Sequence, residues 1–342
     1  MKPLRILMTE PGPAFSVADV HQGWKRAFGD LGHQVVNYNL GDRLTFYSTA
    51  EIKNPEGEHV PAFDHETVQR LAMQGVEAAA LRWWPDVVVV TSGFYMPPAT
   101  IDLFRSRGMK VVILHTESPY EDDRQLQLAP HADVNVVNDP TNLDTFKMVA
   151  PNSVYIPHSF DPAVHHPGKA VSKLKSDVAF VGTAYPSRIE FLEAVDWSGL
   201  DVVLAGNWQA LDDESPLRPF VIHDLEACFP NDQTADVYRS TKVGLNLYRT
   251  EANMPSLADG WSMGPREVEM AACGTFFLRA PRPESDQVFP MLPAFSSPSE
   301  LGDLLRQWVA DDDARTRVAA EARAAVDGWT FACRAEQLLD LI

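Results

Sequence analysis

Residues 264–278 read GPREVEMAACGTFFL and predict a helix that runs directly into a buried strand. Pro265 suits the first helical position, where its missing N–H is not needed, and Gly274 suits the C-terminal cap. The apolar run 275–278 then fits a strand that is covered on both faces. The N-terminus of such a helix carries unpaired N–H groups and a partial positive charge, which together attract phosphate. This stretch therefore predicts an α/β unit with an anion site at the start of its helix.

The same alternation of short apolar runs and helical patterns extends over the whole chain. The expected strands are 4–8, 35–38, 86–91, 110–114, 134–137, 177–181, 201–205, 220–222, 243–247 and 275–278. The clearest expected helices are 18–31, 65–83, 186–195, 234–240 and 265–273. Because runs rich in Val and Ile suit buried parallel strands, the alternation predicts two doubly wound, Rossmann-like parallel-sheet domains facing a cleft.

The segment 157–176, PHSFDPAVHHPGKAVSKLKS, contains three prolines and loses the periodicity, so it is the best linker candidate. We expect an N-terminal acceptor domain at 1–157, an interdomain linker at 158–176 and a C-terminal donor domain at 177–328. A last helical segment, 329–342, is expected to pack back onto the N-terminal domain.

The composition limits the possible functions. The chain has 342 residues, 29 Lys and Arg against 47 Asp and Glu, and a net charge of −18. Such a charge argues against binding nucleic acid by neutralising its phosphates, but it allows a local basic pocket for one small anion. Three separated cysteines fit a reducing compartment. With no long apolar run and no signal-peptide pattern, we expect a cytoplasmic protein without a membrane span.

Two further features point to an anion in the C-terminal half. In DVAFVGTAYPSRIEF, residues 177–191, a strand ends at Gly182 and Arg188 lies in the first turn of the next helix. A cation there opposes the helix dipole, so either a bound anion offsets it or Arg188 pairs with a nearby acid such as Glu190 or Asp196. Asn246 lies on the strand 243–247.

Charged residues near these features are the candidate ligand contacts. Arg266 adds a positive charge at the start of the helix 265–273, and Glu269, one turn further on, is placed to accept hydrogen bonds from ribose hydroxyls. The alternative is a capped amphipathic helix with a surface Arg–Glu pair. Lys242 and Arg249 bracket the strand 243–247; Lys242 is either a second cation of the site or a solvated edge residue.

Four motifs in order carry a resemblance to a known family. FVGTAYPSR (180–188), LAGNW (204–208), KVGLNLYR (242–249) and PREVEMAACGTFFL (265–278) resemble the C-terminal half of CgeB-like, spore-maturation-type glycosyltransferases. These have the GT-B architecture and are similar to the family 4, or group 1, retaining transferases. The segment 156–168 resembles the interdomain segment of that family. The N-terminal half matches more loosely, through DLGHQVVNY.

The resemblance implies roles for particular residues. Glu269 matches the glutamate that holds the donor ribose, Arg188 matches a cation near the donor diphosphate, and Arg266 looks like a second diphosphate contact. Family 4 enzymes carry a Glu-x7-Glu pair, but the position eight residues before Glu269 is Trp261. The retaining outcome that this pair implies is therefore left open, with Glu267 or Asp259 as possible replacements. The whole expected donor set is Gly182, Arg188, Asn246, Arg249, Arg266 and Glu269.

The donor implied is a nucleoside-diphosphate sugar, UDP- or GDP-linked, with no metal and no other cofactor. No Asp-x-Asp motif of the metal-dependent kind is evident, and we expect the acidic runs 121–123 and 212–214 to be solvated loops. His158, His165 and His166 match no metal-ligand spacing and are expected to be structural.

An acceptor base is expected at the carboxyl ends of the N-terminal strands. Glu117 and His115 follow the strand 110–114, and Asp139 follows 134–137. Glu10 ends the first strand and His21 lies in the helix after it. Each of these residues is either the base or a residue that caps or braces a loop.

The function expected from these observations is transfer of a sugar, of the hexosyltransferase type, to an unidentified acceptor. A protein, a glycan or a small molecule is favoured over nucleic acid. The alternatives are a GT-B-like epimerase or phosphorylase using the same cleft, and a catalytically silent nucleotide-sugar-binding scaffold. The oligomeric state is left open.

Overall fold

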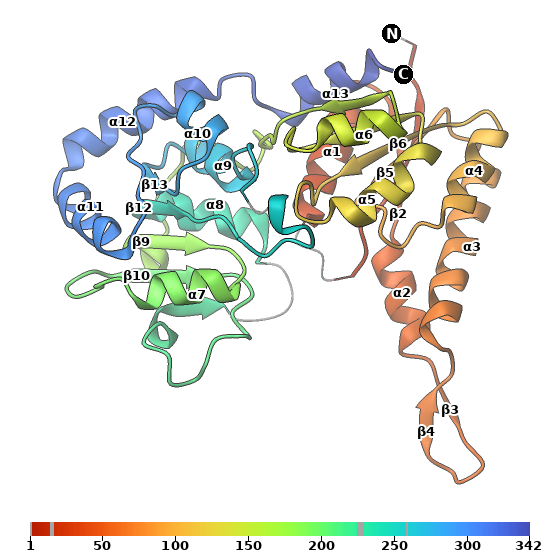
Figure 1. Ribbon diagram of the computed structural model, residues 1–342, viewed down its shortest axis with the longest axis horizontal. Coiled ribbons are helices and arrows are strands. Elements are labelled where there is room, and N and C mark those ends of the chain that lie inside the picture. The colour runs from red at the N-terminus through yellow and green to blue at the C-terminus, as the bar shows by residue number, and fades with distance from the viewer. Residues whose placement is uncertain (1, 14–16, 224–228, 258) are drawn as a thin grey trace. The chain divides into compact units, whose positions relative to one another are not determined.

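The computed structural model describes residues 2–13, 17–223, 229–257 and 259–342. By their internal contacts the residues divide into two units (Figure 1). The first unit is Met1–Ile156 together with the C-terminal Ala335–Ile342, and the second is Pro157–Arg334.

The first unit is built on a six-stranded parallel sheet in the order β2-β1-β5-β6-β7-β8. Its strands are β1 (Arg5–Thr9), β2 (Gln34–Tyr38), β5 (Val87–Thr91), β6 (Lys110–His115), β7 (Val134–Val137) and β8 (Ser153–Tyr155). Its helices are α1 (Ala18–Asp30), α2 (Leu40–Ser48), α3 (His65–Trp83), α4 (Pro98–Ser106), α5 (Asp122–Leu128) and α6 (Leu143–Val149). An antiparallel hairpin, β3 (Glu51–Lys53) and β4 (His59–Pro61), connects α2 to α3.

The second unit is built on a five-stranded parallel sheet in the order β11-β10-β9-β12-β13. Its strands are β9 (Ser176–Val181), β10 (Val202–Ala205), β11 (Val221–His223), β12 (Thr241–Asn246) and β13 (Phe277–Arg279). Its helices are α7 (Pro186–Glu193), α8 (Asn231–Ser240), α9 (Pro265–Cys273), α10 (Pro283–Val288), α11 (Pro298–Ala310) and α12 (Asp312–Ala325). Helix α13 (Phe331–Leu339) follows and continues into the first unit.

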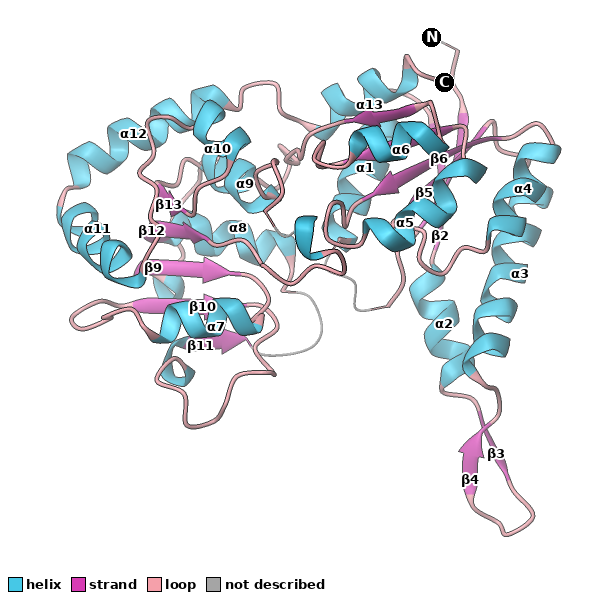
Figure 2. Ribbon diagram, viewed as in Figure 1, coloured by secondary structure: helices cyan, strands magenta, loops and turns pink. Residues whose placement is uncertain are grey.

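These sheets confirm the predicted α/β class with two doubly wound parallel sheets, whose helices alternate with the strands (Figure 2). Helices α3 and α9 have the predicted bounds. The predicted strands lie in place with their ends shifted by a residue or two, because strand ends depend on pairing partners that a sequence pattern does not show. Strand β8 and the β3–β4 hairpin were not predicted, since three-residue strands carry too little periodicity.

Each unit has its own apolar core. In the second, Trp208, Phe277 and Phe289 are among the largest fully buried side chains. In the first, every residue of β5 is buried, as a central strand covered on both faces requires. Among the described residues, no helix combines the length and the apolar character needed to cross a membrane. Cys273 is buried and Cys333 exposed; Cys228 lies outside the described residues.

The strand orders place one topological switch point in each sheet. In the first sheet the chain runs from β1 to β2 on one side and then returns to β5 on the other. In the second it runs from β9 through β10 to β11 and then returns to β12. Open parallel sheets bind ligands beyond the carboxyl ends of the strands at such points. The ends of β1 and β5, and of β9 and β12, are therefore where functional residues are expected.

Candidate functional site

Two glycines let the backbone approach closely at the carboxyl edge of the second sheet. Gly206, directly after β10, has φ +132°, and a Cβ there would lie 2.2 Å from the carbonyl oxygen of Gly182. Gly182, directly after β9, donates its N–H to Ala205 at 2.9 Å. A Cβ on Gly182 would lie 2.9 Å from the ring of Phe180. Gly182, which the sequence predicted as a donor contact, thus allows the chain after β9 and the chain after β10 to lie close together.

Arg188 spans the switch point of the second sheet. Its Nη1 donates to the carbonyl of Thr183, just beyond β9, at 3.0 Å. Its Nη2 donates to the carbonyl of Leu247, just beyond β12, at 2.8 Å. The guanidinium therefore fixes the two strand ends relative to each other and places a half-buried positive charge between them.

A carboxylate of the protein itself lies at the start of α7. The Glu251 carboxylate accepts hydrogen bonds from the Ser187 N–H at 3.0 Å and from the Ser187 hydroxyl at 3.1 Å. The pKa of Glu251 is lowered: burial raises it, but hydrogen bonds from backbone N–H groups outweigh that effect. Asp196, one of the acids considered for Arg188, forms an ion pair with Arg306.

A second cation lies beside the first. The Arg249 guanidinium donates to the Tyr185 hydroxyl at 2.9 Å and lies 5.3 Å from the centre of that ring. The Arg188 guanidinium lies 5.2 Å from the same ring. Tyr185 thus brings two predicted donor contacts together at the carboxyl edge of the sheet.

Asn246, the last residue of β12, faces the start of α9. It is 5% exposed, and a Cβ built on Gly264, the N-cap of α9, would lie 3.7 Å from its Oδ1. Within the described residues, no group accepts a hydrogen bond from its Nδ2. A buried donor without an acceptor costs free energy, so an acceptor atom from a ligand would stabilise this position.

Arg266 and Glu269 form a pair on α9, as the capped-helix interpretation expected. Arg266 Nη1 donates to Glu269 Oε2 at 2.8 Å. The pair is not a surface pair, because the side chain of Glu269 is 7% exposed and that of Arg266 is 25% exposed. Arg266 therefore neutralises a nearly buried carboxylate one turn from the start of the helix.

The linker reaches the same carboxylate through His165. His165 Nε2 lies 3.9 Å from Glu269 Oε2 and 3.1 Å from Asn231 Oδ1. His165 Nδ1 accepts the N–H of Asp161, at 3.3 Å, so the proton of the neutral ring lies on Nε2 and points toward these oxygens. Burial lowers the pKa of His165 despite the opposing effect of Glu269.

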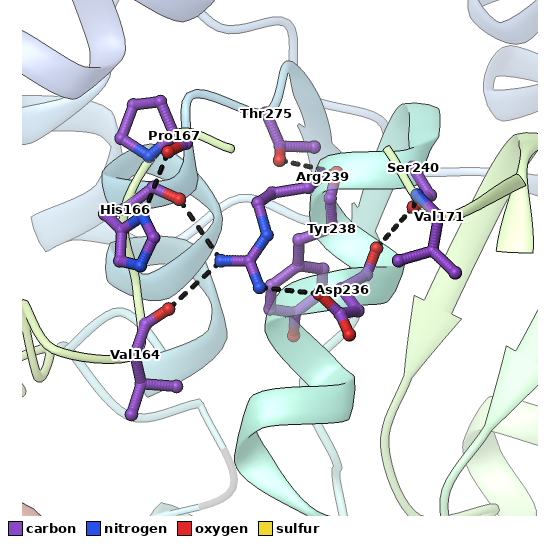
Figure 3. Close-up of polar contacts among 9 residues, drawn as sticks. All are labelled: Val164, His166, Pro167, Val171, Asp236, Tyr238, Arg239, Ser240 and Thr275. Atoms are coloured by element: carbon purple, nitrogen blue, oxygen red, sulfur yellow. Dashed lines mark hydrogen bonds and ion pairs between the residues drawn. The ribbon is translucent and has the colours of Figure 1, made fainter. Parts of the chain in front are cut away.

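Arg239 of α8 holds the predicted linker segment against the rest of the second unit (Figure 3). Its Nη1 donates to the carbonyls of Val164 at 3.1 Å and His166 at 3.2 Å, and its Nη2 donates to Asp236 at 2.7 Å. Further along, the Val171 N–H donates to the Ser240 hydroxyl at 2.9 Å. The structural role expected for this histidine-containing stretch is consistent with these contacts.

A cavity of about 750 Å³ lies between the linker and α12. Its lining includes His166, Gly274 and Arg323. Gly274 is the C-terminal cap of α9, so this cavity lies at the opposite end of that helix from the Asn246 amide.

Glu267, considered as a replacement acid, points into the core. It is fully buried and accepts hydrogen bonds from the Tyr248 hydroxyl, from Ser285 at 2.6 Å and from the Gly264 N–H at 2.9 Å. Burial raises the pKa of Glu267 to about 7, against the lowering effect of these hydrogen bonds. Its contacts are those of a residue that caps α9.

Lys242 does not reach the carboxyl edge. It lies at the amino end of β12, where it forms an ion pair with Asp177, at the amino end of β9, at 2.8 Å. Its side chain is 47% exposed. Because β9 and β12 are parallel, both residues lie at the edge opposite to Arg188, so the solvated-edge alternative is correct.

In the first unit, two of the predicted catalytic residues are buried. His115, the last residue of β6, is 1% exposed and its Nε2 lies 2.8 Å from Asn135 Oδ1. Burial lowers the pKa of His115 to about 4, so the ring is neutral at pH 7. Asp139 is 3% exposed and accepts the Thr141 N–H at 2.7 Å. Glu117 is partly exposed just beyond β6.

A hydrogen-bonded chain joins the two strands at the switch point of the first sheet. Glu10, beyond β1, accepts from Asn37 Nδ2 at 2.6 Å, and Asn37 Oδ1 lies 2.7 Å from His21 Nε2. His21 Nδ1 lies 2.8 Å from the hydroxyl of Thr91, at the end of β5. Burial lowers the pKa of His21 to about 4. The sequence indicated Glu10 and His21 separately; Asn37, which links them, gave no signal.

The acidic run 121–123 is not a solvated loop throughout, contrary to the expectation. Asp122, the first residue of α5, is 0% exposed, and burial raises its pKa to about 6 despite hydrogen bonds with Ser118 and Asn142. Charge runs do not reveal such a residue, because a helix start turns one side chain inward while its neighbours face water. The run 212–214 is exposed, as predicted.

The described part of the chain contains no cluster of three or more His, Cys, Asp or Glu side chains that could hold a metal ion. The predicted donor residues fall into two groups: Gly182, Arg188 and Arg249 at the ends of β9 and β12, and Asn246, Arg266 and Glu269 around α9.

Comparison with known proteins finds one family model that matches part of the chain, and solved structures that share its fold. Residues 188–340 match the model of a family described as glycosyl transferase-like. No curated protein sequence matches the chain. The sucrose-phosphate synthase of Thermosynechococcus elongatus is similar in structure, with a TM-score of 0.66, 13% identity and 98% of each chain covered.

Two further solved structures resemble the chain. One is an alpha-glucosyltransferase in complex with UDP and DNA, with a TM-score of 0.63, 11% identity and 99% of each chain covered. The other is described as trehalose-6-phosphate from E. coli bound with UDP-2-fluoro glucose, with a TM-score of 0.61, 11% identity and 98% of each chain covered. These likenesses show the GT-B fold over the full length. The predicted enzyme class, a glycosyltransferase, is confirmed by the family match in the C-terminal half.

Proposed function

We propose that this chain transfers a sugar from a nucleoside-diphosphate sugar, with UDP as the first choice of nucleotide, and that it is of the CgeB-like type. The observation that carries the proposal is the buried Asn246 amide facing the start of α9, with Arg266 in the first turn of that helix and Glu269 one turn further on. UDP or a UDP-sugar is bound in two similar structures, which favours this nucleotide.

The diphosphate is proposed to lie at the carboxyl edge of the second sheet. Cleavage of the sugar–phosphate bond leaves negative charge on the departing nucleoside diphosphate. Arg188 and Arg249 hold two positive charges around Tyr185, and the start of α9 adds the partial positive charge of the helix dipole. Asn246 Nδ2 donates to a phosphate or sugar oxygen. These groups stabilise the leaving group without requiring a metal ion.

Glu269 is proposed to accept hydrogen bonds from the ribose hydroxyls. Its charge is kept in place by Arg266, and the proton on His165 Nε2 faces the same oxygen. A carboxylate held in this way accepts stronger hydrogen bonds than a neutral group does.

The acceptor is proposed to be activated at the carboxyl edge of the first sheet. A general base must touch the hydroxyl that it deprotonates, so the partly exposed Glu10 and Glu117 are better placed than the buried His115 and Asp139. The net charge of −18 favours a neutral acceptor, such as a glycan, a protein hydroxyl or a small molecule, over a polyanion.

Titration calorimetry with UDP tests the donor site. We expect wild type to bind UDP with or without EDTA, and Asn246→Ala, Arg266→Ala and Glu269→Gln each to weaken binding by roughly 10- to 100-fold, as loss of charged or buried hydrogen bonds implies. The matched controls are Arg317→Ala and Glu321→Gln on the exposed face of α12, which should bind as wild type does.

Hydrolysis of the UDP-sugar in the absence of acceptor then separates an enzyme from a silent binding protein. Slow release of free sugar supports the transferase. Binding without any turnover, with or without a pool of acceptors, would support the scaffold alternative. Unchanged UDP affinity in all three site variants would show that the donor lies elsewhere.

A further inference from the structure

The β3–β4 hairpin extends away from the sheet of the first unit, beyond the ends of α2 and α3 (Figure 1). It forms a two-stranded sheet of its own, with both outer edges unpaired among the described residues. The sequence 51–61 that forms it plays no part in the proposed reaction. An unpaired strand edge is a template for another strand, so natural proteins usually blunt or cover such edges.

The two edges of the hairpin differ. The Ala62 N–H donates to the Ala50 carbonyl at 2.7 Å, and the Asn54 N–H donates to the Glu58 carbonyl at 3.0 Å. In an antiparallel ladder the bonded pairs alternate, so Ile52 bonds inward to Val60 while the backbone groups of Glu51 and Lys53 point outward.

The outer edge of β4 presents His59 and Pro61 instead. Proline has no N–H, so this edge lacks one of its two backbone donors and pairs less well with another strand. The outer edge of β3 keeps a full set of donors and acceptors at Glu51 and Lys53. Of the two edges, β3 is therefore the one that can accept another strand.

The side chains on β3 make this edge complementary to itself. If a second β3 lies antiparallel to the first with Ile52 opposite Ile52, Glu51 of each copy lies directly opposite Lys53 of the other. Opposite charges in directly facing positions stabilise a strand pair. Lys53 has no ion pair within the described part of the chain, while Glu51 lies 3.1 Å from the exposed His59.

Exposed apolar side chains lie on β3 and at the base of the hairpin. Ile52 is 55% exposed, Phe46 near the end of α2 is 63% exposed and Phe63 just beyond β4 is 38% exposed. Phe46 and Phe63 both contact the ring of Tyr47, with ring centres 5.3 and 6.4 Å apart, so they form one aromatic group at the base of the hairpin. Burial of this group against a second copy would add to the strand pairing.

We propose that a second copy of this chain docks on the β3 edge, antiparallel and in this register, to form a symmetric dimer through a four-stranded sheet. A twofold axis between the two Ile52 residues relates the copies, so each contact occurs twice. Because the strand is three residues long and the apolar group is small, the dimer is weak and depends on concentration.

Sedimentation velocity over a dilution series, from micromolar to submillimolar protein, tests the proposal on the full chain. Wild type should shift from monomer to dimer. Lys53→Glu and Glu51→Lys each place like charges opposite each other twice in a dimer and should weaken association by about tenfold or more. The double variant with both substitutions exchanges the charges, restores complementarity and should associate as wild type does.

Glu56→Lys is the matched control, because it makes the same charge change as Glu51→Lys in the turn of the hairpin rather than on β3. It should leave association unchanged. Since all three substituted positions are exposed, each variant should keep the wild-type circular dichroism and melting temperature. A wild type that stays monomeric at every concentration would overturn the proposal, as would a dimer that the single substitutions leave intact or that the double variant does not recover.

Discussion

The imidazole of His165 lies 3.9 Å from the carboxylate of Glu269, and the two side chains are 1% and 7% exposed. One residue comes from the segment that leads into the second unit and the other from α9. The Asp161 N–H bonds to Nδ1 of the imidazole, and Asn231 Oδ1 lies within hydrogen-bond distance of Nε2. These two contacts set the orientation of the ring before any ligand binds. The linker thus contributes directly to the environment of the proposed ribose-binding carboxylate.

His165→Ala is expected to weaken UDP binding by about tenfold, the effect of losing one polar contact to a charged group. The measurement is the dissociation constant of UDP by calorimetry. His166→Ala is the matched control, because the adjacent His166 is exposed and its ring contacts the Pro167 carbonyl at 2.9 Å. Equal affinities for the two variants would mean that His165 does not position Glu269.

Glu267 should make stability fall as pH rises. Burial raises its pKa from 4.5 to about 7, so between these values the folded state retains a proton that the unfolded state has lost. The contribution is fully present below pH 4.5 and is lost by about pH 7, a change on the order of 3 kcal/mol. Glu267→Gln removes this dependence, since its amide does not titrate.

The check is urea denaturation of wild type and Glu267→Gln at several pH values. The stability of wild type minus that of the variant should fall between pH 4.5 and 7. A constant difference for Glu267→Gln would show that this carboxyl is ionised throughout the range.

His115 should act in the opposite direction. Burial lowers its pKa from 6.5 to about 4, so between these values the unfolded state binds a proton that the folded state refuses. Stability from this group is present above pH 6.5 and is lost as pH falls to about 4, on the order of 3 kcal/mol. His115→Gln, whose amide can still donate to Asn135, should lose this acid sensitivity in the same denaturation series. If the stability of His115→Gln falls between pH 6.5 and 4 as steeply as that of wild type, His115 is not a buried neutral imidazole.

Gly206→Ala should destabilise the protein by about 3 kcal/mol or more, because a Cβ at φ +132° would lie 2.2 Å from the Gly182 carbonyl oxygen. Gly199→Ala is the control: its φ is +76°, but no atom lies within 4 Å of the added Cβ, so we expect a loss of about 1 kcal/mol. Thermal unfolding measures both. Similar losses would mean that the strand ends near Gly206 adjust at little cost.

Arg239→Ala should lower the free energy of unfolding by about 3 kcal/mol, because it leaves the Val164 and His166 carbonyls without this donor. The exposed Arg317→Ala should change it by less than about 0.5 kcal/mol. If Arg239→Ala also weakens UDP binding, the position of the segment 164–166 affects Glu269 through His165.

Local sequence was sufficient for features that depend on neighbouring residues. Proline at the first position and glycine at the cap set the bounds of α9, and alternating apolar runs indicated both parallel sheets. Short elements such as β8 carried no usable pattern. Sequence also does not show which individual acids are buried. Asp122 lies in a run of charges, and Glu267, whose position in the sequence suits a replacement for a catalytic acid, faces the core.

The sequence by itself determined the α/β class, the order of the donor motifs and the residue types that suit a diphosphate and a ribose. Tertiary structure alone decided which of these side chains meet. Arg188 and Arg249 converge on Tyr185, whereas Lys242, immediately before the buried run of β12, lies at the opposite edge. The physical reason is that parallel strands gather their carboxyl ends on one edge, and strand direction with the pairing order assigns each residue to an edge. Tertiary structure also placed His165 beside Glu269. The two residues are 104 positions apart, so no local pattern contains this contact.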